Sequence, residues 1–233
     1  MKYCLIVFAV IFSHCSYAVS LCYDESPPYA YLRNDTDPAS VSGQSLAMVQ
    51  NIFKHIPSVT VKVTLLPWKR CQQLASEGVY DGILQASFNK QRNEQFKFSD
   101  PLFYSYGRYF ALKSKKIDKY KLHNASHLSV GLLRGNYYGP HITPLIEKGV
   151  FKQTTYSTTP QQLMGLLEKG RVDIVLFEES SGWEVASRQN IKDKIEVIGS
   201  PYMLIDYRLV LSQKSKHLEL LPKINEAIKE INK

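Results

Sequence analysis

The sequence lacks the short motifs that mark common metal sites, nucleotide sites and nucleophilic enzymes. It has no Cys-x-x-Cys pair, no Gly-x-Ser-x-Gly turn and no glycine-rich phosphate loop. His123 and His127 stand four residues apart, but the segment LHNASHLS around them is polar and turn-like and offers no third ligand. We therefore expect a binding protein rather than an enzyme, with no metal and no cofactor.

Basic residues outnumber acidic ones but form no cluster. The 233 residues include 29 Lys and Arg against 21 Asp and Glu, a net charge of +8, spread along the chain in ones and twos. Nucleic-acid binding depends on a basic patch or stripe that follows the phosphates. The sequence instead predicts a mildly basic surface and no nucleic-acid partner.

Long apolar runs are also missing, apart from one at the N-terminus. Met1 and Lys2 precede the ten apolar residues YCLIVFAVIF, a run too short to span a bilayer. Ser16 and Ala18 place small residues at the −3 and −1 positions of a cleavage site. We predict that residues 1–18 are a signal peptide and that the mature chain lies in the periplasm. A retained N-terminal anchor is the alternative.

Cysteine is scarce, with four residues in the chain. Cys4 and Cys15 belong to the predicted signal peptide, so Cys22 and Cys71 remain. An even number of cysteines in an oxidising compartment favours one disulfide. Two separate buried thiols are the alternative.

Strand and helix patterns alternate along the chain in two sets. Ser42 is a candidate N-cap for the first helix, and Gly78 is a natural residue to end the second. Pro222 stands in the first turn, or at a kink, of the last helix. The elements expected in chain order are strand 19–24, helix 42–56, strand 58–67, helix 68–77, strand 80–87, strand 98–113, strand 128–135, helix 139–149, strand 151–157, helix 159–170, strand 172–178, helix 180–189, strand 194–200, strand 202–212 and helix 218–232.

Such alternation is typical of parallel sheets covered by helices. No low-complexity linker separates the two sets, and the joins between them are strands. We predict an α/β fold of two lobes, each a mostly parallel sheet with flanking helices, joined by two crossing strand segments. Residues 19–107 and 206–233 would form lobe 1, and residues 108–205 would form lobe 2.

One pattern occurs in both sets. Segments 78–88 and 170–180 each read Gly-x-x-Asp-x-x-Leu, and each follows a helical pattern. The first copy leads to Ser87 and Arg92, whereas the second ends at Glu178. Ligands of open parallel sheets sit at the carboxyl ends of the strands, so these opposite charges suit a zwitterion held between the lobes. Asp81 and Asp173 we assign to bonds with nearby backbone N–H groups.

The order of residues in 66–105 is more specific than any single motif. Trp68, the Gly78–Asp81 turn, Ser87, Arg92 and then FSDPLF follow one another. In this the chain resembles periplasmic solute-binding proteins of the polar-amino-acid type, extracellular family three with the type II periplasmic-binding fold. The resemblance covers essentially all of the mature chain. It implies a monomer that closes its lobes on an amino acid or similar ligand, for an inner-membrane permease or a sensor.

The resemblance also implies site residues. Ser87 and Arg92 match positions that hold the ligand carboxylate, and Glu178 matches the acid that holds its ammonium. The remaining matches are Gly135 and Tyr137, in a loop that offers backbone N–H groups to an anion, and Tyr29 or Tyr31 with Trp68, in an aromatic wall.

The chain departs from the family pattern at three points. Gln85 stands where members often have glycine, GQSLA replaces a segment that often carries an aspartate, and Glu178 is one methylene longer than the usual aspartate. These departures leave the identity of the ligand open.

Each principal site residue also has a structural interpretation. Arg92 can pair with Glu94 or Asp100 at the surface. Glu178 can serve as the N-terminal charge of the helix that follows it. Trp68 can belong to the core.

Two other functions compete with solute binding. Periplasmic cyclohexadienyl dehydratases resemble this family and use a carboxylate for proton transfer, a role open to a buried Glu178 and tested by prephenate turnover. The aromatic loop 23–31 can alternatively serve as the surface of an interaction protein.

Overall fold

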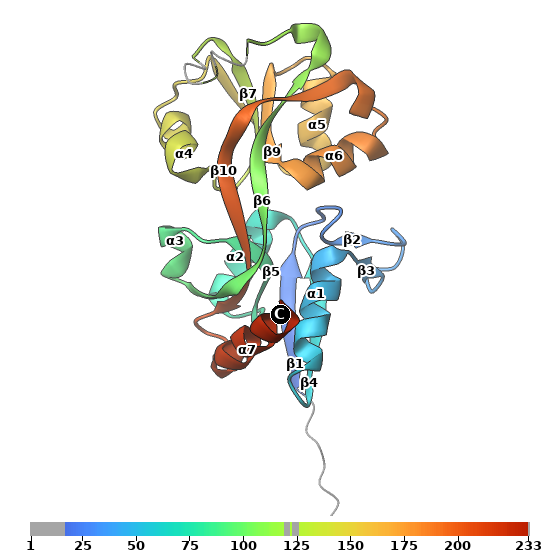
Figure 1. Cartoon of the computed structure of the whole chain (residues 1–233), viewed down its shortest axis with the longest axis vertical. Coiled ribbons are helices and arrows are strands. Elements are labelled where there is room, and N and C mark those ends of the chain that lie inside the picture. The colour runs from blue at the N-terminus through green and yellow to red at the C-terminus, as the bar shows by residue number, and fades with distance from the viewer. Residues whose placement is uncertain (1–16, 119–121, 123–125, 233) are drawn as a thin grey trace, which may run out of the picture.

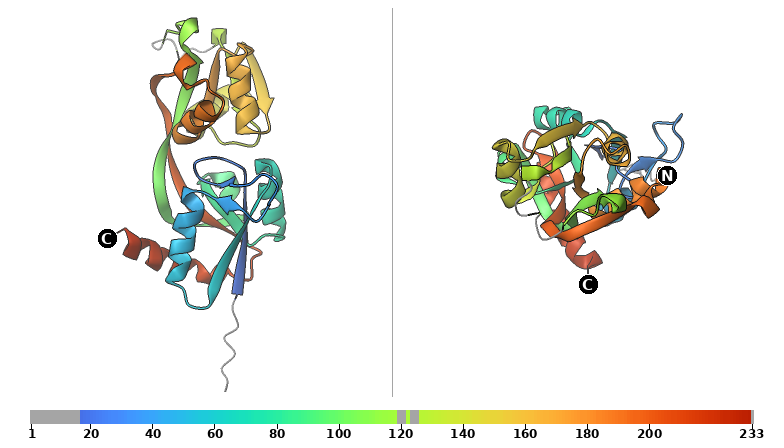
Figure 2. Two further views of the ribbon diagram at one scale, coloured as in Figure 1. Left: turned by 90° about the vertical axis from the view of Figure 1, so that its right-hand side faces the viewer. Right: turned by 90° about the horizontal axis from the view of Figure 1, so that it is seen from above.

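The chain forms two lobes connected by two long strands, as Figure 1 shows. The computed structural model describes residues 17–118, 122 and 126–232. Strands β6 (Phe96–Leu112) and β10 (Ile195–Ser212) run through both lobes, and Figure 2 shows them along one edge of the molecule. The predicted two-lobed α/β fold with crossing strands is therefore confirmed, while the residue limits given above for the lobes stay a prediction.

The remaining elements alternate largely as predicted. The shorter strands are β1 (Tyr17–Tyr23), β2 (Tyr31–Leu32), β3 (Val41–Ser42), β4 (Val59–Leu65), β5 (Gly82–Ser87), β7 (Ser129–Leu133), β8 (Gln153–Ser157) and β9 (Ile174–Glu178). The helices are α1 (Gln44–Lys54), α2 (Trp68–Glu77), α3 (Lys90–Asn93), α4 (Gly139–Glu147), α5 (Pro160–Glu168), α6 (Glu179–Arg188) and α7 (Leu221–Ile231), with 3-10 turns at Lys113–Lys115, Lys192–Lys194 and Leu218–Leu220.

Eight strands from both lobes belong to one sheet, and β2 and β3 form a separate two-stranded antiparallel sheet. The order of the eight-stranded sheet is β4-β1-β5-β10-β6-β9-β7-β8. β1 is parallel to β4 and β5, and β7 is parallel to β8 and β9, whereas the two long strands run antiparallel to each other and to their neighbours. The strand ends of the two parallel sets therefore approach the space between the lobes.

Segments 194–200 and 202–212, predicted as two strands, form the single strand β10. Its register with β6 is irregular between Ile198 and Met203, around Gly199 with its positive φ of 64°. The Gly-Ser-Pro sequence there resembles a turn, but pairing with β6 resumes beyond it. This error arose because a local pattern does not show that the partner strand continues.

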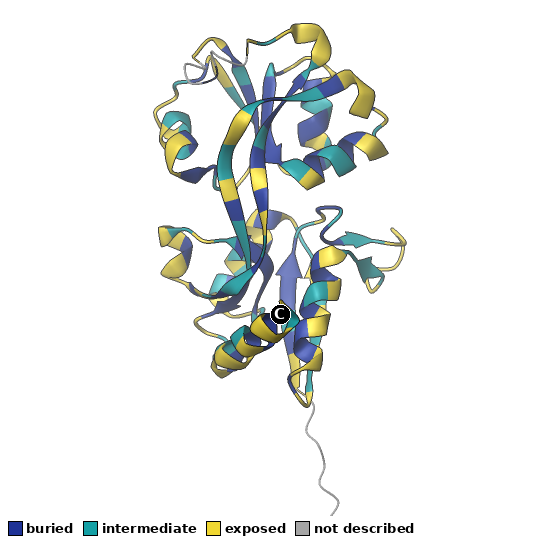
Figure 3. Cartoon of the chain, in the orientation of Figure 1, coloured by how far each residue is buried: buried dark blue, intermediate teal, exposed yellow. Residues whose placement is uncertain are grey.

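Each lobe has its own hydrophobic core. In the first lobe, side chains of β1, β5, α1, α2 and α7 form one cluster. In the second lobe, two clusters lie around β7 and β9. Figure 3 shows the buried faces of the helices turned toward the sheet and their exposed faces turned outward.

Helix ends were predicted with mixed success. Gly78 ends α2 with a left-handed φ of 86°, and Pro222 lies in the first turn of α7, as predicted. Ser42 is not the N-cap of α1, because it belongs to β3 and Gly43 occupies the cap position. Gly43 has a φ of 135°, and a Cβ there would lie 2.1 Å from the carbonyl oxygen of Tyr29. Only glycine fits at this contact.

Cys22 and Cys71 form the predicted disulfide, which ties the end of β1 to the first turn of α2. Both residues are fully buried. The bond therefore fixes two elements that contribute residues to the space between the lobes.

Asp81 and Asp173, the aspartates of the repeated Gly-x-x-Asp pattern, each link two neighbouring strands in the same way. The Asp81 carboxylate accepts hydrogen bonds from the backbone N–H of Ser20 at 2.9 Å and from its hydroxyl at 2.7 Å. Asp173 accepts the same pair of bonds from Ser129, at 2.9 and 2.6 Å. The structural interpretation of both aspartates is confirmed.

The strand β1 begins at Tyr17, which pairs with Val59. Cleavage after Ala18 would therefore leave a strand that starts at Val19. Most of the predicted signal peptide lies outside the described residues, and its cleavage stays a prediction. None of the described helices is both long and apolar enough to cross a membrane.

Candidate functional site

The carboxyl ends of β1, β5 and β9 surround a cavity of about 60 Å³ between the lobes. The cavity brings together five of the seven residues predicted for the site, which are Trp68, Ser87, Arg92, Tyr137 and Glu178. The other two, Tyr29 and Gly135, do not line it but contact residues that do. The structure thus brings most of the predicted residues to one cavity at the strand ends, while their role as a ligand site stays a prediction.

Arg92 is a buried cation held by neutral groups. It lies in the short helix α3, whose N-cap Asn89 accepts a hydrogen bond from the Arg92 N–H at 2.8 Å. Its Nη1 donates to the Ser87 carbonyl at 3.0 Å and hydroxyl at 3.1 Å, and its Nε donates to Gln72 Oε1 at 3.3 Å. The guanidinium lies 5.1 Å from the ring centroid of Trp68. Burial lowers the pKa of Arg92 to about 10, which leaves the side chain charged at neutral pH.

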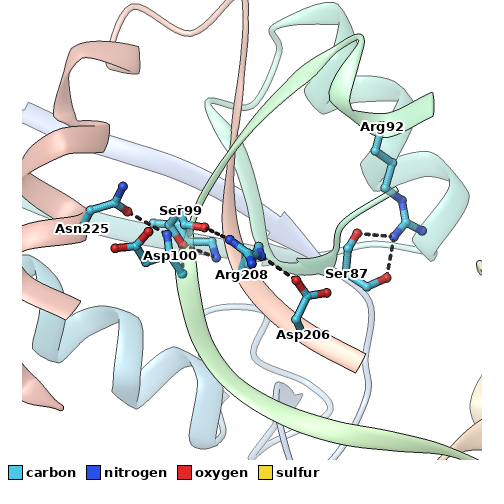
Figure 4. A network of polar contacts seen from close by, with 8 residues as sticks. Ser87, Arg92, Ser99, Asp100, Asp206, Arg208 and Asn225 are labelled. Atoms are coloured by element: carbon cyan, nitrogen blue, oxygen red, sulfur yellow. Dashed lines mark hydrogen bonds and ion pairs between the residues drawn. The ribbon is translucent and has the colours of Figure 1, made fainter. Parts of the chain in front are cut away.

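Arg208, a second arginine, has the carboxylate partner that Arg92 lacks among the described residues. Figure 4 shows Arg208 bonded to the Asp206 carboxylate, at 2.7 Å, whereas the dashed lines from Arg92 reach only Ser87. Within the described part of the chain no carboxylate lies within 4.0 Å of Arg92. The alternative prediction that Arg92 pairs with Glu94 or Asp100 is therefore wrong. Arg92 is 8% exposed, so its charge has no bonded acid in the described part and little contact with water to balance it.

Glu178 is the N-cap of α6 and accepts four hydrogen bonds. Its Oε1 accepts from the Tyr29 hydroxyl at 2.9 Å, from the Ser105 hydroxyl and from the Ser180 N–H at 2.9 Å. Its Oε2 accepts from the Ser181 N–H at 2.7 Å. The structural interpretation of Glu178 is confirmed; the residue lines the cavity, and most acceptor positions of its carboxylate are already in use.

Protein groups join the two lobes directly at both sides of the cavity. We call these the interlobe contacts: Tyr29 with Glu178 (2.9 Å), Ser26 with Ser181 (3.2 Å), Trp68 Nε1 with the Gly135 carbonyl (3.1 Å), and the Arg188 guanidinium over the Tyr31 ring (4.7 Å to the centroid). Figure 1 shows the first lobe's β2–β3 segment below α6 on one side of the molecule, and α3 below α4 on the other.

Gly135 contributes its carbonyl to an interlobe contact, with a positive φ of 82°. Tyr137 lines the cavity, and the next helix, α4, begins only at Gly139. That this loop offers N–H groups to an anion stays a prediction. Tyr31 lies against Arg188 rather than in the cavity wall, whereas Trp68 both lines the cavity and belongs to the core, as its structural interpretation predicted.

The loop 23–31 is not an exposed aromatic surface. Tyr23 is 5% exposed and Tyr29 is 4% exposed, and Tyr29 packs on Phe103 and Tyr207 at centroid distances of 5.4 and 5.5 Å. The hypothesis of an interaction protein that uses this loop is therefore wrong. Tyr23 and Tyr29 are buried in the molecule, and the partly buried Tyr31 lies against Arg188.

Sequence reasoning missed Asp24. It directly follows β1 and lines the cavity, as Ser87 and Glu178 do at the ends of their own strands, so the strand-end rule would have found it. Burial raises the pKa of Asp24 from its ordinary 3.8 to about 7, against a smaller opposing effect of its own backbone N–H. Asp24 is therefore a second acidic group in the cavity, and one that titrates near neutral pH.

Asp24 makes stability depend on pH. Because its pKa is raised on folding, the folded protein holds more protons than the unfolded chain between pH 4 and 7. The free energy of unfolding then falls as pH rises through this window. We expect Asp24→Asn to remove up to about 4 kcal/mol of that fall.

Urea unfolding from pH 4 to pH 8 measures this slope. Glu25→Gln, an exposed neighbour, is the control and should keep the wild-type slope. Identical slopes for Asp24→Asn and wild type would show that Asp24 titrates as an ordinary surface acid.

Gln85 explains one departure from the family pattern. It is fully buried in β5, donates to the Tyr23 hydroxyl at 3.0 Å and accepts from the Ser45 hydroxyl. Its side chain fills space that a glycine would leave open, which narrows the cavity beside Tyr23.

In the described part of the chain no group of three or more metal-binding side chains occurs, and His123 of the rejected zinc pair lies outside that part.

Comparisons with known proteins agree with this architecture. The family model of bacterial extracellular solute-binding proteins, family 3, matches residues 19–233. A search of curated proteins finds no match.

Among solved structures, an ancestral arginine-binding protein bound to arginine has a TM-score of 0.79 at 19% identity, covering 94% of this chain and 94% of that one. A histidine kinase sensor domain with similarity to periplasmic binding proteins has a TM-score of 0.78 at 20% identity, covering 94% and 91%. An amino acid ABC transporter substrate-binding protein from Streptococcus pneumoniae bound to L-arginine has a TM-score of 0.74 at 18% identity, covering 94% and 90%. At these identities the likeness shows a shared fold.

Proposed function

The chain belongs to the bacterial extracellular solute-binding proteins of family 3, and we propose that it is a periplasmic receptor for an amino acid or related zwitterion. The ligand occupies the cavity between the lobes, which close on it by bending of β6 and β10. The receptor then serves import through an inner-membrane permease or signalling through a sensor, and acts as a monomer.

The environment of Arg92 is the observation that carries this proposal. A buried charge is costly unless an opposite charge balances it, and the described chain supplies no carboxylate to this guanidinium. A ligand carboxylate would balance it through a bidentate fork. Asp24 and Glu178 line the same cavity and would receive the ligand ammonium.

Thermal unfolding with a panel of small molecules tests the proposal. The chain from Tyr17 onward, which keeps β1 intact, is unfolded with each amino acid, with dicarboxylates and with amines at millimolar concentration. A ligand at about a thousand times its dissociation constant adds about 4 kcal/mol of stability. For a chain of this size the transition rises by about 8–16 °C. If zwitterions give no larger rise than amines or dicarboxylates alone, the proposal is wrong.

An enzyme on the same scaffold is the second candidate, and Asp24 favours it. A carboxyl group with a pKa near 7 is suited to proton transfer at neutral pH. This differs from the sequence-based hypothesis, which gave that role to Glu178. Prephenate turnover that disappears in Asp24→Asn would support a cyclohexadienyl-dehydratase-like activity, and absence of product would reject it.

A further inference from the structure

A second and larger hollow adjoins the cavity. This groove has a volume of about 490 Å³, against about 60 Å³ for the cavity. It lies between α2 and α3 of the first lobe and α4 with its preceding loop in the second. Arg92, Asn136 and Tyr137 line both spaces, so the groove continues the cavity on the side of the guanidinium.

Carboxamides dominate the chemistry of the groove. Besides Arg92, two charged residues line the groove, the cation Lys69 and the anion Glu147. The side chains of Gln91 and Gln95 are exposed, and within the described chain they form no hydrogen bond. The six carboxamide residues that line it are Gln72, Gln73, Asn89, Gln91, Gln95 and Asn136.

We propose that the groove binds the carboxyl-side residue of a short peptide whose amino-terminal residue occupies the cavity. This inference rests on the proposed function, because it assumes that the cavity takes an ammonium and an α-carbon. A carboxamide side chain offers one acceptor and two donors, which match the C=O and N–H of a peptide unit. The near balance of fixed charge also suits an uncharged backbone.

The positions of the charges give the peptide its direction. Asp24 and Glu178 line the cavity but not the groove, so the ammonium belongs inside. Arg92 stands at the junction, where it would donate to the first carbonyl of a peptide as it would to the carboxylate of a free amino acid. The chain then leaves past α3, toward Lys69, whose ammonium suits the terminal carboxylate.

A hydroxyl-rich sugar is a poorer fit. A sugar ring is commonly held against an exposed aromatic face. Of the two aromatic residues that line the groove, Phe96 is 2% exposed and Tyr137 is shared with the cavity. The groove therefore offers hydrogen bonds without a stacking surface.

Calorimetric titration with matched peptides tests the inference. The probes are L-arginine, L-glutamine and L-serine, their dipeptides with a carboxyl-side glycine (Arg-Gly, Gln-Gly, Ser-Gly) and the reversed dipeptides (Gly-Arg, Gly-Gln, Gly-Ser). We expect one of the first dipeptides to bind about twenty-five-fold more tightly than its free amino acid and than its reversed form, since each of two further hydrogen bonds contributes about a fivefold change. The double variant Gln91→Ala/Gln95→Ala should lose this gain and bind the free amino acid as wild type does. Gln50→Ala, an exposed carboxamide on α1 that lines neither space, is the matched control and should change neither affinity.

The outcomes separate the two proposals. If a free amino acid binds while no dipeptide binds as tightly, the peptide inference is wrong and the proposed function stands. The inference is equally overturned if the double variant weakens the amino acid and the dipeptide alike. If none of these amino acids and none of these dipeptides binds, the peptide inference is wrong, and the thermal-unfolding panel with every amino acid decides the proposed function.

Discussion

Arg92→Met is expected to abolish binding of any solute that carries a carboxylate, and to leave the unliganded protein as stable as wild type or more stable. The Arg92 guanidinium donates hydrogen bonds to Ser87 and Gln72, which are neutral. No acid of the described chain is bonded to it. Replacing a buried charge that has no partner with an apolar side chain of similar length removes a desolvation cost. The methionine would still pack on Trp68.

The loss of binding follows from the ligand carboxylate, which is the proposed partner of Arg92. Without the guanidinium, the ligand carboxylate is buried with no cation, a change that costs about 3 kcal/mol or more, or about a hundredfold in affinity. Calorimetry with the best solute from the panel and thermal unfolding without solute measure the two effects separately. Arg92→Lys keeps the charge but not the fork and should bind at an intermediate level.

Arg208→Met is the matched control. Arg208 bonds to the Asp206 carboxylate and to the Ser99 carbonyl, so its removal leaves partners unsatisfied. It should lower stability while solute binding persists. An Arg92→Met protein that is less stable than wild type yet binds within about fivefold would mean that Arg92 has a structural role, and the site would have to be placed elsewhere.

Removing the disulfide is expected to have the largest effect on stability. Cys22 and Cys71 are 49 residues apart. Closing a loop of that length in the unfolded chain is worth about 4 kcal/mol, which for a protein of this size is about 8–16 °C in the unfolding midpoint. Cys22→Ala/Cys71→Ala should show this decrease, and wild type under reducing conditions should match the double variant.

Removing the disulfide should also weaken ligand binding in the cavity. Cys22 precedes Tyr23 and Asp24, and Cys71 lies one turn from Trp68, so the bond holds neighbouring parts of the first lobe's cavity wall together. Reductant must have no effect on the double variant, which controls for other actions of the reagent. A midpoint within about 2 °C of wild type would show that packing alone holds β1 against α2.

Local patterns in the sequence were enough to predict the fold and to choose residues that the structure brings to one cavity. Ser87 and Glu178 were identified because each ends a strand that follows a helix–glycine turn, and that spacing is contained in about ten residues. Partners far apart in the chain were not predictable in this way. Tyr29 and Glu178 are separated by 149 residues, and their hydrogen bond decides how much of the carboxylate remains for a ligand.

Asp24 and the groove were missed for different reasons. Asp24 stands alone after its strand, with no repeated motif to draw notice, although the strand-end rule applies to it. The carboxamides of the groove come from α2, from α3 and the residues beside it, and from the loop before α4, and exposed Gln and Asn residues carry no local pattern. Only their arrangement across the two lobes gives them a common role.

For the receptor proposed above, whose lobes close on a solute, the interlobe contacts predict an adjustable threshold. They join protein to protein, so they favour the closed form whatever fills the cavity, and each hydrogen bond is worth about 1 kcal/mol, or about a fivefold change in the ratio of closed to open molecules. The apparent affinity for a solute depends on that ratio as well as on the contacts with the solute. A substitution at Ser26 or Tyr31, neither of which need touch the solute, can therefore raise or lower the concentration to which the receptor responds while its preference among solutes stays the same.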